Sequence, residues 1–427
     1  MSRLSLLRRF SALPSQAPSA APLSRFSKVP KGPEDAILGV TVAYNNDTNP
    51  NKINLGVGAY RDDLGLPFVL SAVREAEYRI LDRKPHMEYL PVAGSAMFID
   101  KAIRLAYGTN AFVDSGCVAA VQTLSGTGAC RMAGVLMDRF LDGGSRDSKP
   151  LVLLPNPSWA NHRPIFLDAG CDVDSYAYYD PATKSLDFDG CIKSLSDAPA
   201  GSVVLLHACA HNPTGVDPSL EQWREISAVL KAKGHLPLFD MAYQGFTSGD
   251  MDTDAASLRL FVEDGHRIVL AQSFSKNFGL YGQRVGCLSV LTDSEEETSA
   301  INSQLKIIAR PMYSNPPIAG VRLVEEILGD AELEKSWRSE MRDMALRIIS
   351  MRATLKNNLS ELGSVHNWDH IMNQHGMFCF SGLTKEQVDD LRERHSVYLT
   401  ANGRISMAGV TSKNAQYLAE AVHDVTK

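Results

Sequence analysis

The chain has 427 residues, enough for two or three domains with a substantial core. Hydrophobic residues make up 44% of it and charged residues 22%, as in ordinary globular proteins. A formal net charge of -6 gives no basic footprint for nucleic acid, although a few buried arginines could still bind an anionic ligand. No run approaches the roughly 18 consecutive apolar residues of a membrane span.

The seven cysteines are scattered and form no CxxC pair. An odd, dispersed set predicts neither a disulfide framework nor a zinc site, so reduced thiols in a reducing compartment are expected. The histidines form no cluster with metal-ligand spacing, and no metal is predicted.

Residues 1–28 differ in composition from the rest of the chain. They are rich in Ser, Ala and Leu, contain Arg3, Arg8, Arg9 and Arg25, and precede the first acidic residue, Glu34. This pattern is typical of a mitochondrial transit peptide, and a leader without an address is the alternative. The apolar core of a secretory signal is missing. We therefore expect a mitochondrial matrix protein.

The middle of the chain alternates short apolar runs with helical patterns, which favours an α/β fold with a mainly parallel central sheet and helices on both faces. A helix is expected at Leu220–Lys233 and another at Ala129–Phe140. The strands expected are Leu151–Leu154, Val203–Leu206, Leu236–Phe239, Ile268–Ala271 and Cys287–Leu291.

The carboxyl-terminal part predicts a smaller α+β domain. A long helix is expected from Ala331 to about Leu362, followed by a strand at Gly376–Leu383 and a helix opened by a capping box at Thr384. The domains expected are an amino-terminal arm with part of the small domain over 29–66, a large domain over 67–340 and the small domain over 341–427.

Two details of the small domain are also predicted. Val397–Thr400 and Arg404–Ala408 flank the turn residues Ala401-Asn402-Gly403, which favours a hairpin. Thr411 or Ser412 is expected to cap a last helix.

Polar residues follow the predicted strands of the sheet. Ligands of open α/β sheets bind at the carboxyl ends of the strands, so Asn212, Asp240, Tyr243, Ser273 and Lys276 are expected to converge.

A phosphate site is indicated at Ser125-Gly126-Thr127-Gly128, which precedes a helix whose first amides could bind an anion. Arg131 replaces the third glycine of a dinucleotide fingerprint, and no P-loop lysine follows. Arg284 could add a bidentate contact.

Lys276 follows an apolar strand and could be a nucleophilic amine, although a lone lysine is usually a surface charge. An aldehyde cofactor with a phosphate group needs such a lysine, an anion cradle and a carboxylate for its ring nitrogen, which Asp240 can supply.

Five motifs together resemble the aspartate aminotransferases of the class I pyridoxal-phosphate-dependent family, in order and over nearly the whole chain after residue 32. The leader makes the mitochondrial type the nearest match, and fold type I is implied. The motifs are Asn54–Arg61 (NLGVGAYR), Leu124–Gly128 (LSGTG), His207–Gly215 (HACAHNPTG), Asp240–Phe246 (DMAYQGF) and Ser273–Tyr281 (SFSKNFGLY).

The resemblance implies pyridoxal 5'-phosphate as cofactor and gives residues their roles. Lys276 would carry the cofactor and move a proton, Asp240 would pair with the ring nitrogen with His162 behind it, and Trp159 would stack on the ring. Tyr243 and Asn212 would bind the phenolic oxygen. The phosphate would be held by Ser125, Gly126, Thr127, Ser273, Arg284 and, from a neighbouring subunit, Tyr89.

The same resemblance implies the substrates and a homodimer with shared active sites. Arg404 would bind the α-carboxylate, with Gly58, Trp159 and Asn212 also at the substrate, and Arg310 would reach the side-chain carboxylate across the dimer interface. The implied reaction is reversible ping-pong transfer of the amino group of L-aspartate to 2-oxoglutarate, giving oxaloacetate and L-glutamate.

Departures from the family pattern are small. Ala93–Met97 and Ala160 differ from the residues usual there and bear on fine substrate preference. Three alternatives stay open: an aminotransferase that also accepts aromatic amino acids, a decarboxylase or β-lyase on the same fold, and a binding protein without activity.

Overall fold

The computed structural model describes residues 24–32, 36–109, 111–141 and 149–427. The chain divides into two compact units, Met1–Asp35 and Ala36–Lys427. In the first unit the described residues form a turn in which the Ser27 amide donates to the Ser24 carbonyl (2.9 Å). The rest of the predicted transit peptide lies outside the described residues. Among the helices described, none is long and apolar enough to cross a membrane.

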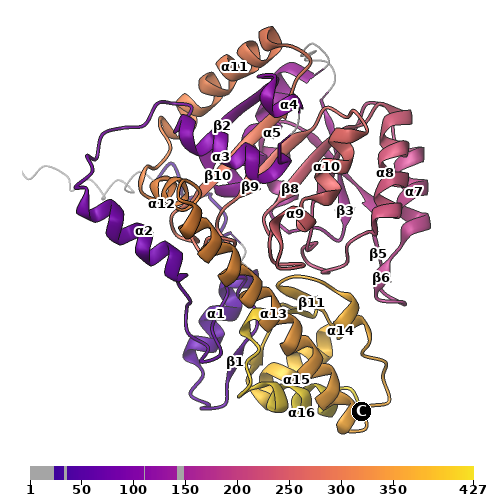
Figure 1. Cartoon of the computed structure of the whole chain (residues 1–427). Coiled ribbons are helices and arrows are strands. Elements are labelled where there is room, and N and C mark those ends of the chain that lie inside the picture. Colours follow the sequence, from indigo (N-terminus) through magenta and orange to yellow (C-terminus); the bar gives the residue numbers. More distant parts are fainter. Residues whose placement is uncertain (1–23, 33–35, 110, 142–148) are drawn as a thin grey trace, which may run out of the picture. The chain divides into compact units, whose positions relative to one another are not determined.

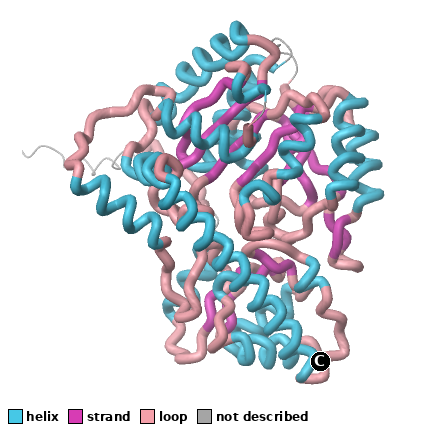
Figure 2. Tube along the Cα trace, in the orientation of Figure 1, coloured by secondary structure: helices cyan, strands magenta, loops and turns pink. Residues whose placement is uncertain are grey.

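A seven-stranded sheet organises the second unit (Figures 1 and 2). Strand β10 is antiparallel to both of its neighbours and the remaining pairs are parallel. The fold is therefore the expected α/β class with a mainly parallel sheet. The strands, in spatial order, are β2 (Val118–Leu124), β10 (Val285–Leu291), β9 (Val269–Ser273), β8 (Leu236–Met241), β7 (Val203–His207), β3 (Leu151–Asn156) and β4 (Asp172–Ala177).

The five strands predicted for the middle of the chain are all present, with ends within two residues of the expected positions. Their runs are apolar because both faces of the sheet are buried. On β7 and β8, Leu205 and Leu238 belong to one core cluster, whereas Leu206 and Phe239 belong to the other. Strands β2 and β4 were not predicted; β4 is an edge strand with a polar, partly exposed sequence.

Helices pack on both faces of the sheet. Helix α5 (Ser125–Phe140) contacts β9 and β10, and it begins at Ser125 rather than at the expected Ala129. Helix α8 agrees with the predicted Leu220–Lys233. The other helices of this part are α2 (Ser71–Asp82), α3 (Ala96–Tyr107), α4 (Ala111–Asp114), α6 (His162–Asp168), α7 (Phe188–Asp197), α9 (Met251–Asp254), α10 (Ala256–Glu263), α11 (Glu295–Tyr313) and α12 (Ala319–Ile327), and a short hairpin joins β5 (Tyr179–Asp180) to β6 (Ser185–Leu186).

The long helix α13 (Ala331–Glu361) leads from the sheet-bearing part to the carboxyl-terminal elements (Figure 1). The capping box predicted at the start of α15 is present between Thr384 and Gln387. The amino-terminal elements α1 (Ala36–Asn46) and β1 (Ile53–Asn54) join this region, since β1 pairs with β12. The remaining elements are α14 (His370–Asn373), β11 (Phe378–Phe380), α15 (Lys385–His395), β12 (Val397–Tyr398), β13 (Arg404–Ser406), the 3-10 helix η2 (Met407–Gly409) and α16 (Ala415–Val425).

The predicted hairpin is wrong. The Gly403 amide does close a turn onto the Thr400 carbonyl (2.9 Å), but the two strands have different partners. Strand β12 pairs in parallel with β1, and β13 pairs antiparallel with β11. The turn was predicted correctly, but pairing with distant strands determines the partners of β12 and β13.

Two element ends also differ from prediction. The strand expected at Gly376–Leu383 is shorter and comprises only β11. The Gln374 side chain bonds the backbone where this strand ends: its Oε1 accepts from the Phe380 amide (2.7 Å) and its Nε2 donates to the Phe380 carbonyl (3.1 Å). The last helix begins at Ala415. In the turn before it, the Thr411 amide donates to Oδ1 of Asn414 and the Asn414 amide donates to the Thr411 hydroxyl.

Candidate active site

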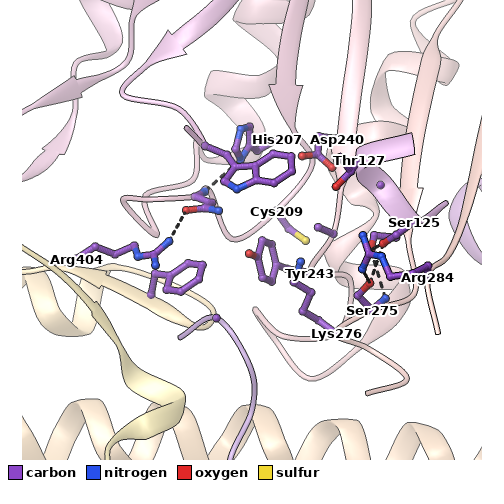
Figure 3. A pocket seen from close by; sticks show the side chains of 17 residues that line it. Ser125, Thr127, His207, Cys209, Asp240, Tyr243, Ser275, Lys276, Arg284 and Arg404 are labelled. Carbon is purple, nitrogen blue, oxygen red and sulfur yellow. Dashed lines mark hydrogen bonds between the residues drawn. The ribbon is translucent and has the colours of Figure 1, made fainter. Parts of the chain in front are cut away.

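A pocket with a cavity volume of about 240 Å³ lies where β7, β8 and β9 end and α5 begins (Figure 3). It contains the site residues predicted from the sequence except Tyr89, Arg310 and His162, which lies against Asp240 without lining the pocket. Its lining residues are Gly58, Ser125, Gly126, Thr127, Trp159, His207, Cys209, Asn212, Asp240, Ala242, Tyr243, Ser273, Ser275, Lys276, Arg284, Phe378 and Arg404.

Lys276 lies three residues after the end of β9, and its amine lies over the ring of Tyr243, 5.1 Å from the ring centroid (Figure 3). Burial lowers the pKa of the amine, Asp240 opposes this, and the nearby Arg284 and Arg404 lower it further. No carboxylate of the described residues forms an ion pair with Lys276. A buried amine whose charged form is disfavoured is suited to attack an aldehyde.

Asp240 lies near the end of β8, and its Oδ2 is 3.1 Å from Nε2 of His162. Nδ1 of His162 is in turn 2.8 Å from the hydroxyl of Ser158. Burial acts to raise the pKa of Asp240, but the hydrogen bond with His162 and the potential of His207 and Lys276 bring it below its usual value. The carboxylate therefore stays ionised inside the protein, as a partner for a protonated ring nitrogen.

Hydroxyl groups gather at the first turn of α5. The Ser125 hydroxyl lies 2.9 Å from that of Ser273 and 2.7 Å from that of Ser275. Nη1 of Arg284 lies 3.3 Å from the Ser275 hydroxyl. Three hydroxyls, a guanidinium and the free amides of a helix start form a cradle for a dianionic phosphate.

The backbone at this cradle is strained. Ser125 and Arg284 have φ of 61° and 55°, in the left-handed region that non-glycine residues rarely occupy. Gly286 permits the close approach, because a Cβ there would lie 2.5 Å from the Ser125 carbonyl carbon. Ser125 and Arg284 therefore adopt an unfavourable backbone conformation at the place where hydrogen-bond donors converge.

Arg404, on β13, is only 5% exposed, and among the described residues no carboxylate pairs with it. Its Nη2 donates to the Gly56 carbonyl (2.9 Å) and its Nη1 to Oδ1 of Asn212 (3.4 Å), whereas Nε has no partner. A buried guanidinium with an unsatisfied donor carries a large desolvation cost unless an anion joins it. This site fits the carboxylate of a small substrate.

The remaining predicted residues complete the walls. Tyr243 lies between Lys276 and Phe378, and burial raises the pKa of its phenol. The Trp159 ring packs edge-on against His162, with ring centroids 5.1 Å apart. The indole and the phenol thus line the same pocket as the ionised Asp240.

Tyr89 and Arg310 lie outside this pocket within the single chain. Tyr89 is 83% exposed, and the exposed Arg310 donates to the Ser314 hydroxyl (2.8 Å). The resemblance assigns both to a site shared with a neighbouring subunit, so their absence from this chain's own pocket agrees with that assignment without testing it.

Several lining residues were not predicted. His207 ends β7 directly opposite Asp240 in the register, so the rule that found Asp240 could have found it. Burial lowers the pKa of His207 to about 3, and the ring stays neutral. Ser275 precedes Lys276 and was within the quoted motif. Phe378 comes from β11, and no sequence signal placed it in the pocket.

The lysine, phosphate cradle and ionised carboxylate define an enzyme that holds an aldehyde cofactor with a phosphate group, next to an arginine for a carboxylate substrate. The sequence pattern described as "Aminotransferase class I and II" matches residues 50–422. A mitochondrial aspartate aminotransferase of Dictyostelium discoideum is 54% identical over 403 residues, covering 94% of this chain and 93% of the relative.

Solved structures agree with this match. A mitochondrial aspartate aminotransferase of Trypanosoma brucei superposes with a TM-score of 0.87 at 44% identity, covering 91% of this chain and all of the other. An aromatic-amino-acid aminotransferase of Burkholderia pseudomallei, covalently bound to pyridoxal phosphate, gives 0.91 at 40% identity over 95% of this chain and all of its own. The chain belongs to the class I and II aminotransferase family.

Proposed function

We propose that this chain is an aspartate aminotransferase that uses pyridoxal 5'-phosphate. It transfers the amino group of L-aspartate to 2-oxoglutarate, reversibly and by a ping-pong mechanism, giving oxaloacetate and L-glutamate. The observation that carries this proposal is the buried Arg404, which has no carboxylate partner among the described residues and lines one pocket with Lys276 and the phosphate cradle. The mitochondrial aspartate aminotransferases at 54% and 44% identity support the substrate.

The residues present fit this cofactor. The hydroxyls of Ser125, Ser273 and Ser275, the helix start at Gly126 and Thr127, and Arg284 would hold its phosphate. When bound, the cofactor supplies an aromatic ring that accepts the electron pair released at the substrate's Cα.

The chain's own residues provide orientation and proton transfer. The Lys276 amine, whose charged form is disfavoured by burial, would take the proton from Cα of the substrate and deliver it to C4′ of the cofactor. The ionised Asp240 keeps a proton on the ring nitrogen, and His162 fixes its orientation. Tyr243 and Asn212, which line the same pocket, would donate to the phenolic oxygen, and Trp159 would stack on the ring and exclude water.

Two arginines select a dicarboxylate. Arg404 binds the α-carboxylate next to Gly58, and Arg310 of a neighbouring copy binds the side-chain carboxylate. This assignment rests on a homodimer in which Tyr89 likewise reaches the neighbour's phosphate site. An arginine buried under a neutral side chain would be costly, which is the physical basis for preferring aspartate and glutamate.

The mitochondrial names of the relatives and the arginine-rich, acid-free composition of residues 1–28 support a mitochondrial matrix protein with a transit peptide. We propose a division into an amino-terminal arm with part of the small domain over 29–66, a large domain over 67–340 and a small domain over 341–427.

A second candidate, an aminotransferase that also accepts aromatic amino acids, is favoured by the Burkholderia pseudomallei neighbour. Steady-state kinetics with L-aspartate and L-phenylalanine, each against 2-oxoglutarate, separates the two. Parallel double-reciprocal lines with aspartate and little turnover of phenylalanine support the first. Comparable kcat/KM values for the two amino acids support the second. No turnover of either would refute both.

A further inference from the structure

We propose that Arg352, outside the pocket, is a positioning residue for α-carboxylate recognition, because it fixes the backbone that places the Phe378 ring against Arg404. This inference rests on the proposed aminotransferase function and extends it to a residue that contacts no substrate.

Arg352 is unusual in its burial and in its partners. It lies on α13, is 2% exposed and, among the described residues, has no carboxylate within ion-pair distance. Nη1 donates to the Ile371 carbonyl (2.9 Å), and Nη2 donates to the carbonyls of Gly376 (2.9 Å) and Phe378. Burial lowers the pKa of the guanidinium, and the neighbouring Cys379 side chain opposes this shift. These bonds fix one segment, residues 371–378.

That segment contacts the substrate arginine at its far end. The Phe378 ring lies under the Arg404 guanidinium, 4.2 Å from ring centroid to Cζ, and edge-on to Tyr243 at 5.9 Å. A Cβ on Gly58 would lie 3.1 Å from the tip of the same ring. The ring thus occupies one face of the guanidinium, excludes water from it and leaves the donor edge for an anion. Arg352 donates to the backbone carbonyl of Phe378 and so fixes the residue that bears this ring.

The segment also packs on the loop that carries Asn212. The His375 amide donates to the Gly215 carbonyl (2.6 Å), and a Cβ on Gly215 would lie 2.7 Å from the Phe378 carbonyl oxygen. Asn212 is the side-chain acceptor of Arg404. Movement of residues 374–378 would therefore disturb both the ring under Arg404 and the loop beside it, while Lys276 and the phosphate cradle lie on other elements.

The test uses the holoenzyme of Arg352→Met, which keeps the volume but removes the donors, and Arg352→Lys, which keeps a charge and part of the hydrogen bonding. Leu359→Ala is the matched control, since Leu359 is buried on the same helix and lines no part of the pocket. We expect Arg352→Met to raise KM about tenfold for L-aspartate and by the same factor for L-glutamate and 2-oxoglutarate, because all share the α-carboxylate. Cofactor affinity is expected to stay within twofold of wild type, and Arg352→Lys to recover part of the loss.

A second variant makes the link to Phe378 testable even if Arg352→Met folds poorly. Phe378→Leu should raise KM in the same pattern, and Arg352→Lys in that background should add little further increase, because both changes act on one contact. If the increase in KM of the double variant equalled the product of the two single increases, the proposal would be overturned. It would also be overturned if the Arg352 variants, like Leu359→Ala, lowered only the melting temperature at unchanged KM. A wild-type enzyme without turnover would instead contradict the proposed function itself.

Discussion

Oδ2 of Asp240 lies 3.1 Å from Nε2 of His162, which is fully buried and has its other ring nitrogen 2.8 Å from the Ser158 hydroxyl. The pair favours the ionised carboxylate deep in the protein, although burial alone would raise the pKa of Asp240. In the proposed mechanism the electron-accepting role of the cofactor depends on that charge, so the relationship is open to direct test.

Replacing His162 by phenylalanine should raise the pKa of Asp240, since the hydrogen bond that opposes burial is lost. The variant's kcat/KM should fall as pH is lowered, in a range where the wild type stays constant. His162→Gln, which keeps an N–H donor, serves as the control and should resemble wild type. Matching pH profiles for all three proteins would show that His162 does not tune the carboxylate.

Removing the charge of Asp240 should affect turnover more than binding. Asp240→Asn is expected to lower kcat about a hundredfold or more, as when a preorganised electrostatic group is lost. The melting temperature should change little, because the amide is isosteric. A kcat within a few-fold of wild type would remove Asp240 from the reaction.

Lys276→Ala should leave a folded protein that binds the cofactor without a covalent bond and shows little or no transamination. Borohydride, which fixes an imine, should then fail to retain the cofactor on denaturation. Near-normal turnover by this variant would contradict the assignment of Lys276.

The lowered pKa of Lys276 also predicts a pH dependence of stability. In the folded apoprotein the amine releases its proton below the ordinary value of 10.5, so between the two pKa values the unfolded chain binds more protons. The free energy of unfolding from Lys276 therefore rises with pH across that window. Lys276→Met should remove this rise and be at least as stable as wild type near neutrality, which denaturant titrations of the two apoproteins would measure.

Ser275→Ala should weaken cofactor binding through the phosphate. A hydrogen bond to a charged group contributes about 1.5–3 kcal/mol, so its loss corresponds to a roughly ten- to hundredfold higher dissociation constant. Ser257→Ala is the control, because that buried serine donates to the Ala208 carbonyl (2.6 Å) outside the pocket. Equal dissociation constants for the two variants would place the phosphate elsewhere.

Exchange of Arg310 for aspartate should raise KM for L-aspartate and improve cationic amino acids, if the arginine of one copy serves the site of another. Arg224→Asp, at an exposed arginine of α8 beside Glu221, is the matched control. An unchanged preference for aspartate would place Arg310 outside the shared site.

The sequence predicted the residues that follow sheet strands, because the carboxyl ends of parallel strands meet at one edge. Asp240 and Lys276 were found in this way, and His207 could have been. The predicted hairpin at residues 397–408 failed, because Val397 pairs with Ile53, more than 300 residues earlier, and no local pattern encodes that choice. Phe378 and Arg352 were missed for the same reason, since their roles arise only when β11 packs beside β13 and α13.

The most direct test of the account is a half-reaction. The purified protein loaded with cofactor is mixed with L-aspartate alone, and the cofactor absorption is followed with the oxaloacetate formed. We predict complete conversion to the amine form of the cofactor with one oxaloacetate per site, reversed by adding 2-oxoglutarate. An unchanged spectrum with L-aspartate, together with a change on adding another amino acid, would contradict aspartate as the substrate while leaving the fold and the cofactor in place.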